Sequence, residues 1–346
     1  MDSRRFALAL LLGALVLTLI GVTGSPCDIP APAERVNDID VLYHVIADMR
    51  AGQGYYPAMS STLREFGYCL RPLPAFRLPL LTTVGSLVPE PIIRVFLVAL
   101  ACCVAAAWTW ETRRAGRLVT VIAGALLLFP VAMSAYASWA WLMPDLWIGL
   151  LIALALWWYP RNRIGTFVCA ALALAIREHA VVFVLTMGMM ALWEKRYRQA
   201  GIWGAFVCGF ILYLAIHAHM VSGYVTPADR ARQWVCFPGW PFVVSTVRWT
   251  WPGFFLFSFT RVNAVVPPLV LLGLFQYPGD LGKRMASTVL AYMCAFMFVG
   301  RADSWYWGLL YCPLLAIGLA YSIPALRQLL RCAFPSSAPT ESDTHP

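Results

Sequence analysis

Two carboxylates spaced two residues apart begin the most informative segment of the sequence, at Asp38 and Asp40. The residues that follow place apolar side chains at positions 41, 42, 45, 46 and 49, which is the spacing of one face of a helix. Asp40, His44 and Asp48 recur every four residues and share the opposite, polar face. We expect an amphipathic helix along a membrane surface, with its carboxylates serving as a general base or in a metal site. In the alternative, Asn37 or Asp38 caps the helix and Asp40 complements its dipole.

Two more polar clusters interrupt apolar stretches in the middle of the chain. Asp145 ends the segment 139–145, which is rich in tryptophan, and it is either a helix cap in an interfacial aromatic belt or a functional acid. Arg177, Glu178 and His179 form a charged trio between two apolar runs. Because charges are costly inside a bilayer, we expect this trio between two short helices near one membrane face, lining a cavity. A solvated turn is the alternative.

A late cluster and a set of arginines complete the candidate residues. Arg301 and Asp303 precede an aromatic stretch, and they either take part in a site or simply pair with each other. Guanidinium groups near a bilayer surface suit a lipid phosphate, although each one alone could be an interfacial anchor. The arginines in or next to the segment 220–253 are Arg230, Arg232, Arg248 and Arg261.

Composition identifies the class of protein. Of 346 residues, 60% are hydrophobic and only 12% are charged, far more apolar than a soluble protein allows. The expected fold class is an all-α polytopic membrane protein. The net charge of +9 is spread between apolar runs without a basic patch, so no nucleic-acid partner is expected. The chain has no Walker, Rossmann, GxSxG or HExxH pattern, and His217 and His219 read as interfacial residues rather than metal ligands.

Ten apolar segments predict about ten transmembrane helices, several shorter than the roughly 20 residues of a perpendicular crossing. With the N-terminus in the cytoplasm, every short loop on that side carries an excess of arginine and lysine. A single helix over 164–193 would reverse all later loops, so two short helices are preferred there. The segments are 6–22, 91–110, 117–137, 144–159, 164–176, 180–193, 200–219, 254–274, 285–299 and 305–323.

This layout predicts one transmembrane domain over residues 1–333, with both termini cytoplasmic. Its long extracytoplasmic loops are 23–90 and 220–253, and 334–346 is expected to be a disordered cytoplasmic tail. The first apolar run also resembles a signal peptide, but it lacks a clear cleavage site and is interpreted as a membrane anchor. Cys27 and Cys69 share the first loop and could pair in an oxidising compartment.

The first loop resembles the modified DxD loop of the GT-C glycosyltransferases, and most closely that of their mannosyltransferases. The resemblance rests on an N-terminal helix, Asp38-Ile39-Asp40, a following helix and an ending at Tyr56-Pro57. Arg177-Glu178 between short helices and Arg301 before an aromatic stretch are also similar to that superfamily. The motifs are short, but as architecture the resemblance spans most of the chain. It implies a multi-pass enzyme of the plasma (inner) membrane that uses polyprenyl-phosphate sugars.

The resemblance implies an inverting displacement at the extracytoplasmic face of the cell envelope. Asp40, or Asp38, is expected to accept the proton of the acceptor hydroxyl, and Arg177, Arg301 or a loop arginine to stabilise the departing lipid phosphate. Because no large soluble C-terminal domain is visible, transfer of a single sugar is expected. No cofactor is assigned, although Asp38, Asp40 and His44 could hold a divalent cation. The residues expected to orient the sugar or the acceptor are Glu178, His179, Asp145 and His44.

Two other classes of function remain open from the sequence. A transporter or flippase of a lipid-linked substrate would show internal repeats and ionisable groups at mid-membrane depth, and neither is visible here. A non-catalytic subunit of an envelope-assembly complex would keep the same charge pattern without activity. The enzyme, unlike a scaffold, should depend on Asp40. The acceptor can be a lipid, a glycan or a protein.

Overall fold

The computed structural model describes residues 3–25, 37–231, 233–250 and 260–335. In these ranges the chain is helical and has no strand beyond two isolated bridges, so the all-α prediction is confirmed there. Five helices are long and apolar enough to cross a membrane. They are α1 (Ser3–Thr23), α5 with its 3-10 extension (Glu90–Ala115), α6 (Arg117–Tyr136), α10 (Tyr197–Ser222) and α16 (Cys312–Ala333).

Other helices fill the space between these five. Ten crossings stay a prediction, because the apolar ones among the shorter helices have fewer residues than a perpendicular span and part of the expected segment 254–274 lies outside the described residues. The bundle helices are α7 (Pro144–Trp158), α8 (Arg163–Ile176), α9 (Val181–Trp193), α14 (Val266–Gln276) and α15 (Gly279–Phe298). The others of eight or more residues are α2 (Asp38–Arg50), α3 (Tyr55–Glu65), α4 (Leu80–Leu87) and α11 (Gly239–Thr246).

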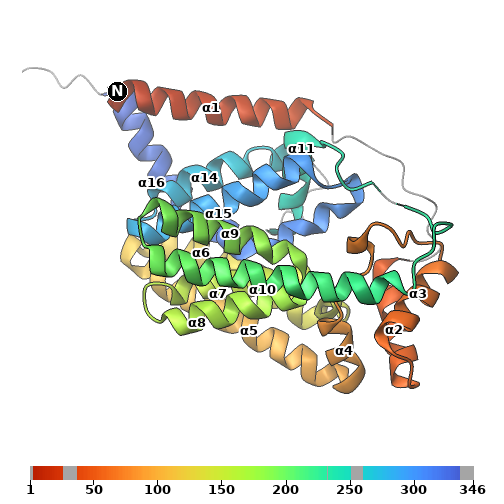
Figure 1. Ribbon diagram of the computed structural model, residues 1–346. Helices are drawn as coiled ribbons and strands as arrows, with labels where there is room; N and C mark the ends of the chain where they lie inside the picture. Colours follow the sequence, from red (N-terminus) through yellow and green to blue (C-terminus); the bar gives the residue numbers. More distant parts are fainter. Residues whose placement is uncertain (1–2, 26–36, 232, 251–259, 336–346) are drawn as a thin grey trace, which may run out of the picture.

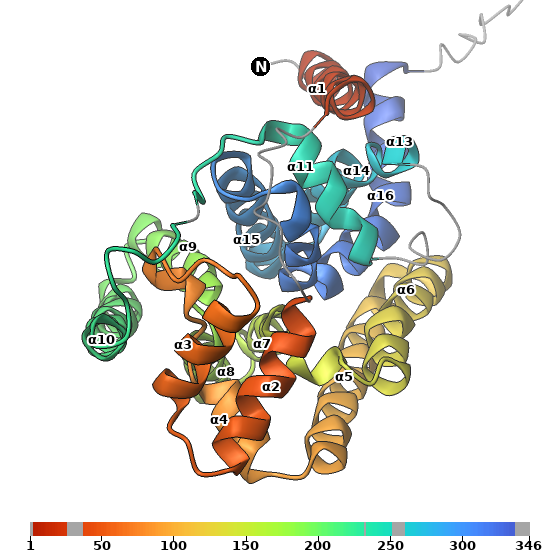
Figure 2. The ribbon, with the colours of Figure 1, turned by 90° about the vertical axis from the view of Figure 1, so that its right-hand side faces the viewer.

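The bundle helices run side by side, and α2, α3 and α4 gather at one end of them (Figure 1). Viewed onto that end, α2 and α3 lie in front of α7 and α8 (Figure 2). Helices α9 and α10 flank them on one side and α5 and α6 on the other, while α11, α14, α15 and α16 form the remaining part. The end of the molecule that carries α2 and α3 is therefore the one where the predicted site residues can meet.

The first long loop is a helical unit rather than an extended connection. Helix α2 forms as expected, but its apolar face, Val41, Leu42, Val45 and Ile46, is buried inside the protein. Helix α2 packs on α3 and α4. Neighbouring helices, rather than a bilayer, therefore cover this apolar stripe, and a position along the membrane surface stays a prediction.

The charged trio lies between two short helices, as the sequence predicted. Helix α8 ends at Ile176, Arg177 is extended, and a 3-10 turn over Glu178–Ala180 leads into α9. The expected helix 305–323 differs from the structure. Residues Ala302–Leu310 form a 3-10 segment, and α16 then runs from Cys312 to Ala333, past the predicted end. Residues 336–346 of the predicted tail lie outside the described residues.

Helix α1 stands at the edge of the bundle, against α16, α11 and α14 (Figures 1 and 2). Only Ala7 of its 21 residues is buried, and Phe6, Leu12 and Leu15 are exposed. Arg4 donates a hydrogen bond from Nε to the carbonyl oxygen of Ala333 at 3.2 Å. The beginning of the first helix and the end of the last one therefore lie together at the end of the molecule opposite α2.

At that same end, a buried charge joins the bundle helices. Arg284 of α15 is fully buried and bonded to the Glu194 carboxylate at the end of α9. Its guanidinium also lies 4.2 Å from the centre of the Tyr159 ring, at the end of α7. A buried guanidinium needs both a counter-charge and a polarisable neighbour, and this arrangement supplies both.

Helices α14 and α16 cross at two glycines. A methyl group placed on Gly273 would lie 1.9 Å from the carbonyl oxygen of Gly318, so the backbones approach as closely as glycine permits. Small residues at such crossings allow backbone contact between membrane helices, where the hydrophobic effect adds little to association. This crossing joins α14 to the last helix of the bundle.

We predict that Gly273→Ala lowers the melting temperature of the purified protein, because the added methyl must separate α14 from α16. Overpacking of this kind costs about 1–3 kcal/mol. Gly209→Ala on α10 is the matched control, because a methyl there meets nothing within 4 Å and alanine favours the helix. Thermal unfolding in nanodiscs measures both. Equal melting temperatures for the two variants would contradict the close crossing.

Candidate functional site

A cavity of about 630 Å³ opens at the end of the bundle beside α2. Its volume is typical of a pocket for a small molecule. Charged and aromatic side chains from separate stretches of the chain line it together. They are Asp38, Asp40, Arg77, Arg177 and Asp303, with Tyr43, Tyr68, Trp139, Trp234 and Tyr306.

The two predicted carboxylates are held at the start of α2. The Asn37 side chain caps the helix, accepting hydrogen bonds from the backbone N–H groups of Ile39 and Asp40 at 2.9 and 3.0 Å. Its Nδ2 donates to Asp40 Oδ2 at 2.7 Å. Asp38 instead accepts from Arg77 Nη2, at 2.6 Å. The same turn thus presents one carboxylate paired with a cation and one held only by an amide.

Arg77 is a residue that the sequence analysis did not single out. It lies before α4, between the buried side chains of Phe76 and Leu78. Its carbonyl oxygen accepts a hydrogen bond from the Tyr55 hydroxyl. Its Nη1 is buried and has no hydrogen-bond partner in the described part of the chain. Arg77 therefore lines the cavity while one of its donor atoms is buried without a hydrogen-bond partner in the described residues.

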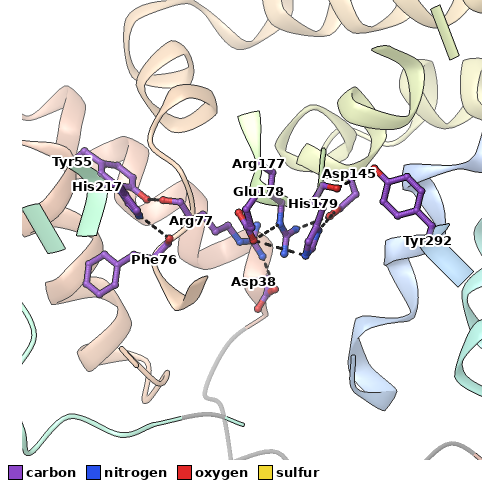
Figure 3. Close-up of polar contacts among 10 residues, drawn as sticks. All are labelled: Asp38, Tyr55, Phe76, Arg77, Asp145, Arg177, Glu178, His179, His217 and Tyr292. Atoms are coloured by element: carbon purple, nitrogen blue, oxygen red, sulfur yellow. Dashed lines mark hydrogen bonds and ion pairs between the residues drawn. The ribbon is translucent and has the colours of Figure 1, made fainter. Parts of the chain in front are cut away.

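His217 holds the same stretch of backbone from the side. Its Nε2 lies 3.1 Å from the carbonyl oxygen of Phe76 (Figure 3). Its Nδ1 lies 3.1 Å from the Tyr56 hydroxyl. A neutral ring that donates from Nε2 and accepts at Nδ1 satisfies both contacts. His217 is 1% exposed, so its ring is buried inside the protein, and its position at a membrane interface stays a prediction. His217 thus holds the carbonyl group of Phe76, and Tyr55 holds that of Arg77.

A buried ionic cluster forms the floor behind these residues. Asp145, in the first turn of α7, is fully buried and accepts from Arg177 Nη1 at 2.7 Å. Its other oxygen lies 3.1 Å from His179 Nδ1 (Figure 3). Glu178 lies 3.4 Å from Arg177 Nε, and Tyr292 of α15 donates to the carbonyl oxygen of His179 at 3.0 Å. The structure therefore brings Asp145 together with the trio, with the charge of Arg177 already balanced.

The other residues predicted for the site, Arg301 and His44, lie further from the centre of the cavity. Arg301 is buried and pairs with Asp303 at 3.5 Å, and Asp303 reaches the cavity. His44 is exposed and contacts the ring of Phe66, at a centroid distance of 4.8 Å. It is not among the described residues that line the cavity. His44 therefore stands apart from the carboxylates with which the sequence grouped it.

Aromatic rings close one side of the cavity. The Trp234 ring stacks on Trp307 with 6.0 Å between centroids, and Trp307 meets the His179 ring edge-on at 4.6 Å. Trp234 comes from the loop between α10 and α11, so this loop supplies a wall of the site. Its aromatic side chains alone did not reveal this role, because the stack forms with residues far along the chain.

The loop after α10 is fastened to α3. Asp229 accepts two hydrogen bonds from Arg64, both at 2.9 Å, and one from the Thr226 backbone N–H at 2.6 Å. The hydrogen bonds from Arg64 and then from Thr226 hold the pKa of Asp229 below its usual range. Arg71 adds hydrogen bonds from its guanidinium to the Asp229 carbonyl oxygen, at 3.0 and 2.7 Å.

A cation site built on three residues finds no support in the arrangement. Asp38 pairs with Arg77 and His44 lies against Phe66, so the suggested ligands Asp38, Asp40 and His44 do not converge. Among the described residues there is no group of three or more histidines, cysteines or acids placed to hold a metal ion. Cys69 is buried, and its suggested partner Cys27 lies outside the described residues.

Comparison of the chain with models of known protein families, with curated proteins and with solved structures finds no match. The residues of the cavity therefore carry the functional argument on their own.

We predict strong energetic coupling between Asp145 and Arg177. Asp145→Asn or Arg177→Gln alone leaves the other charge buried and should cost about 3–5 kcal/mol. The double variant should cost less than the sum by about 0.5–3 kcal/mol. Unfolding of the four proteins in matched detergent measures this. Asp280→Asn, which removes an exposed pair with Arg196, is the control, with a change below about 1 kcal/mol. Strict additivity would contradict the pairing.

We predict that the loop after α10 stays closed down to unusually acid pH. Because folding lowers the pKa of Asp229, its bonds stabilise the loop above the ordinary carboxyl pKa of about 4 and are lost as the pH falls toward the lowered value. Hydrogen exchange of amides 224–231, corrected for intrinsic rates, should be flat from neutral pH to about pH 4. Asp229→Asn should exchange faster throughout. Loss of protection in the wild type well above pH 4 would contradict this.

Proposed function

We propose that the protein is a membrane glycosyltransferase of GT-C type with about ten crossings. It transfers a single sugar from a polyprenyl-phosphate donor to an acceptor at the extracytoplasmic face of the plasma membrane. One observation carries the proposal: two carboxylates of a single helix turn and two arginines, Arg77 and Arg177, line one cavity. Transfer from a lipid phosphate needs a base for the acceptor and positive charge for the leaving group, and this cavity holds both.

Helix lengths support a site that lies below the outer membrane surface. Helices α8 and α9 have 14 and 13 residues, about 20 Å each, against a hydrocarbon core of roughly 30 Å. If α8 starts and α9 ends at the cytoplasmic face, the trio between them lies about 10 Å inside the outer boundary of that core. A lipid-linked phosphate can then reach the arginines while its chain stays in the bilayer, and the acceptor arrives from the aqueous side.

The distribution of charge and one contact support a cytoplasmic placement of both termini. Arg4 bonds the end of α16, so both ends of the described chain lie opposite the cavity. The loops at that end carry Arg113, Arg114, Arg161 and Arg196, which is the excess of positive charge typical of the cytoplasmic side. The cavity is then extracytoplasmic.

The proposed reaction is a single displacement. The acceptor hydroxyl oxygen attacks the anomeric carbon, and its proton passes to Asp40. The bond from that carbon to the phosphate oxygen breaks, and its electrons leave with the polyprenyl phosphate. Asp40 suits the role of base because the hydrogen bond that its carboxylate accepts in the described structure comes from the Asn37 amide, not from a cation. Attack from the side opposite the leaving group inverts the anomeric centre.

Arg77 takes the leaving phosphate in this mechanism. Arg177 is balanced by Asp145 and Glu178, whereas Arg77 has one carboxylate partner and a buried Nη1 without one in the described chain. Asp38 orients Arg77 through Nη2, and Tyr55 and His217 fix its backbone. Arg177, with Asp145 and His179, provides the rigid floor, while Trp139, Trp234 and Tyr306 flank the sugar.

We expect donor consumption to depend on Asp40. Purified protein in nanodiscs is incubated with a panel of polyprenyl-phosphate monosaccharides and envelope extract, and donor loss is followed by mass spectrometry. Asp40→Asn should lower turnover about 10²–10⁴-fold, because the acceptor loses its base. Asp48→Asn on the same helix is the matched control, because among the described residues Asp48 does not line the cavity, and it should keep full turnover.

Donor binding, measured beside donor consumption, separates the role of the base Asp40 from that of the phosphate ligand Arg77. Asp40→Asn should retain donor binding, whereas Arg77→Gln should lose it, because only the second variant removes the proposed phosphate contact. If no donor is consumed, or if wild type and Asp40→Asn consume it equally, the glycosyltransferase proposal fails and a transporter or scaffold takes its place.

A further inference from the structure

A second hollow adjoins the cavity on its aqueous side. It has a volume of about 380 Å³ and lies between the end of α3 and the loop after α10. We call it the arginine cleft, and it is lined by Arg64, Gly67, Tyr68, Leu70, Ala228, Asp229 and Arg230. Tyr68 also lines the main cavity, so the two hollows share a wall. A chain-like ligand in the cleft would therefore lie next to the cavity at Tyr68.

The arginine cleft is electropositive despite its one carboxylate. Asp229 accepts from Arg64 Nε and Nη2, from the Thr226 N–H and from the Thr226 hydroxyl, so both of its oxygens are occupied. The Arg230 guanidinium is exposed, and its one contact within the described chain is the Gly67 carbonyl oxygen at 3.5 Å. The guanidinium of Arg230 thus has hydrogen-bond donors available for a ligand. The carboxylate oxygens of Asp229 already accept hydrogen bonds from the protein.

The backbone that carries Arg230 is fixed. The Arg230 carbonyl oxygen accepts the N–H groups of Leu70 and Arg71, both at 3.2 Å, and Arg71 pairs with Ala231 in a parallel bridge. The Arg71 side chain also donates to the carbonyl oxygens of Pro227 and Asp229. A guanidinium presented from a fixed backbone loses less freedom on binding, which favours recognition of an anion.

The position of the cleft favours a water-soluble ligand over a lipid. Its residues 228–230 follow α10, whose 26 residues span about 39 Å and so exceed a hydrocarbon core of roughly 30 Å. The lining is dominated by charged and backbone groups, with Leu70 and Ala228 as the aliphatic members. A lipid headgroup would need an apolar flank for its tails, which this lining does not offer.

We propose that the arginine cleft binds the acceptor and that the acceptor is an anionic sugar chain bearing carboxylates or phosphates. Arg230 pairs with an oxyanion of the chain, and the chain passes Tyr68 so that its terminal hydroxyl reaches Asp40. Guanidinium forks match carboxylates and phosphates in two parallel bonds. The assignment as an acceptor rests on the proposed glycosyl transfer, whereas binding of the anionic chain by the cleft does not.

The test uses the full chain in nanodiscs of zwitterionic lipid. Binding of a fluorescent oligogalacturonate is measured by polarisation, beside a neutral malto-oligosaccharide of equal length. Wild type should bind the anionic chain selectively and more weakly as salt rises. Arg230→Gln should weaken this binding about tenfold or more, because a charge-assisted pair is lost, and Arg230→Lys should retain part of it. Arg261→Gln removes an exposed arginine outside the cleft and should bind as wild type.

Three outcomes overturn the proposal. They are equal binding of the anionic and neutral chains, unchanged binding by Arg230→Gln, and Arg230-dependent capture of phosphatidylglycerol vesicles without glycan binding, which would make the cleft a headgroup site. The two proposals fail separately. Donor consumption without glycan binding refutes the cleft alone. Glycan binding that depends on Arg230 without donor consumption keeps the cleft and refutes glycosyl transfer.

Discussion

The buried contact between Asp145 and Arg177 is the interaction on which the rest of the structure depends. It joins the first turn of α7 to the break between α8 and α9, and His179 completes it from the same break. A buried charge is costly without an ionic partner, so the pair stabilises the break between the two short helices. The same residues form the floor of the cavity and support the ring of Trp307, on which the Trp234 wall stacks. Helix length, cavity depth and aromatic lining therefore have one electrostatic cause.

Much of this arrangement could be predicted from local patterns. Apolar spacing located α2, and a charged trio between apolar runs located the break after α8, because both signals lie within a few residues. The sequence predicted the apolar face of α2 but not the helices that cover it. Hydrophobic periodicity indicates that a face is buried, but it does not identify the packing partner. The number of crossings stays a prediction, because helices of 13 to 15 residues are shorter than the hydrocarbon core of a bilayer is thick.

Arg77 and the arginine cleft could not be predicted, and for a common reason. Arg77 is one of several arginines in the first loop, and the contact that fixes its backbone comes from His217, 141 residues away from Phe76. Arg64 and Asp229, which close the cleft, are 165 residues apart. Single charged residues in polar loops carry no periodicity, so only the tertiary contacts separate them from ordinary surface charges. The part of the molecule around the cavity thus depends on contacts between residues far apart in the chain. The bundle helices, in contrast, follow from the hydrophobic pattern of the sequence.

The position of α1 bears on how the molecule is assembled. Its packing partners, α11, α14 and α16, all come from the last third of the chain. During synthesis α1 therefore enters the bilayer first and has no docking surface until these helices have been inserted. Its exposed apolar surface lets it wait in lipid without a partner, and the bond from Arg4 to Ala333 can form only once translation has reached the end of α16. The contacts of the first helix can thus be completed only after the last helix has been made.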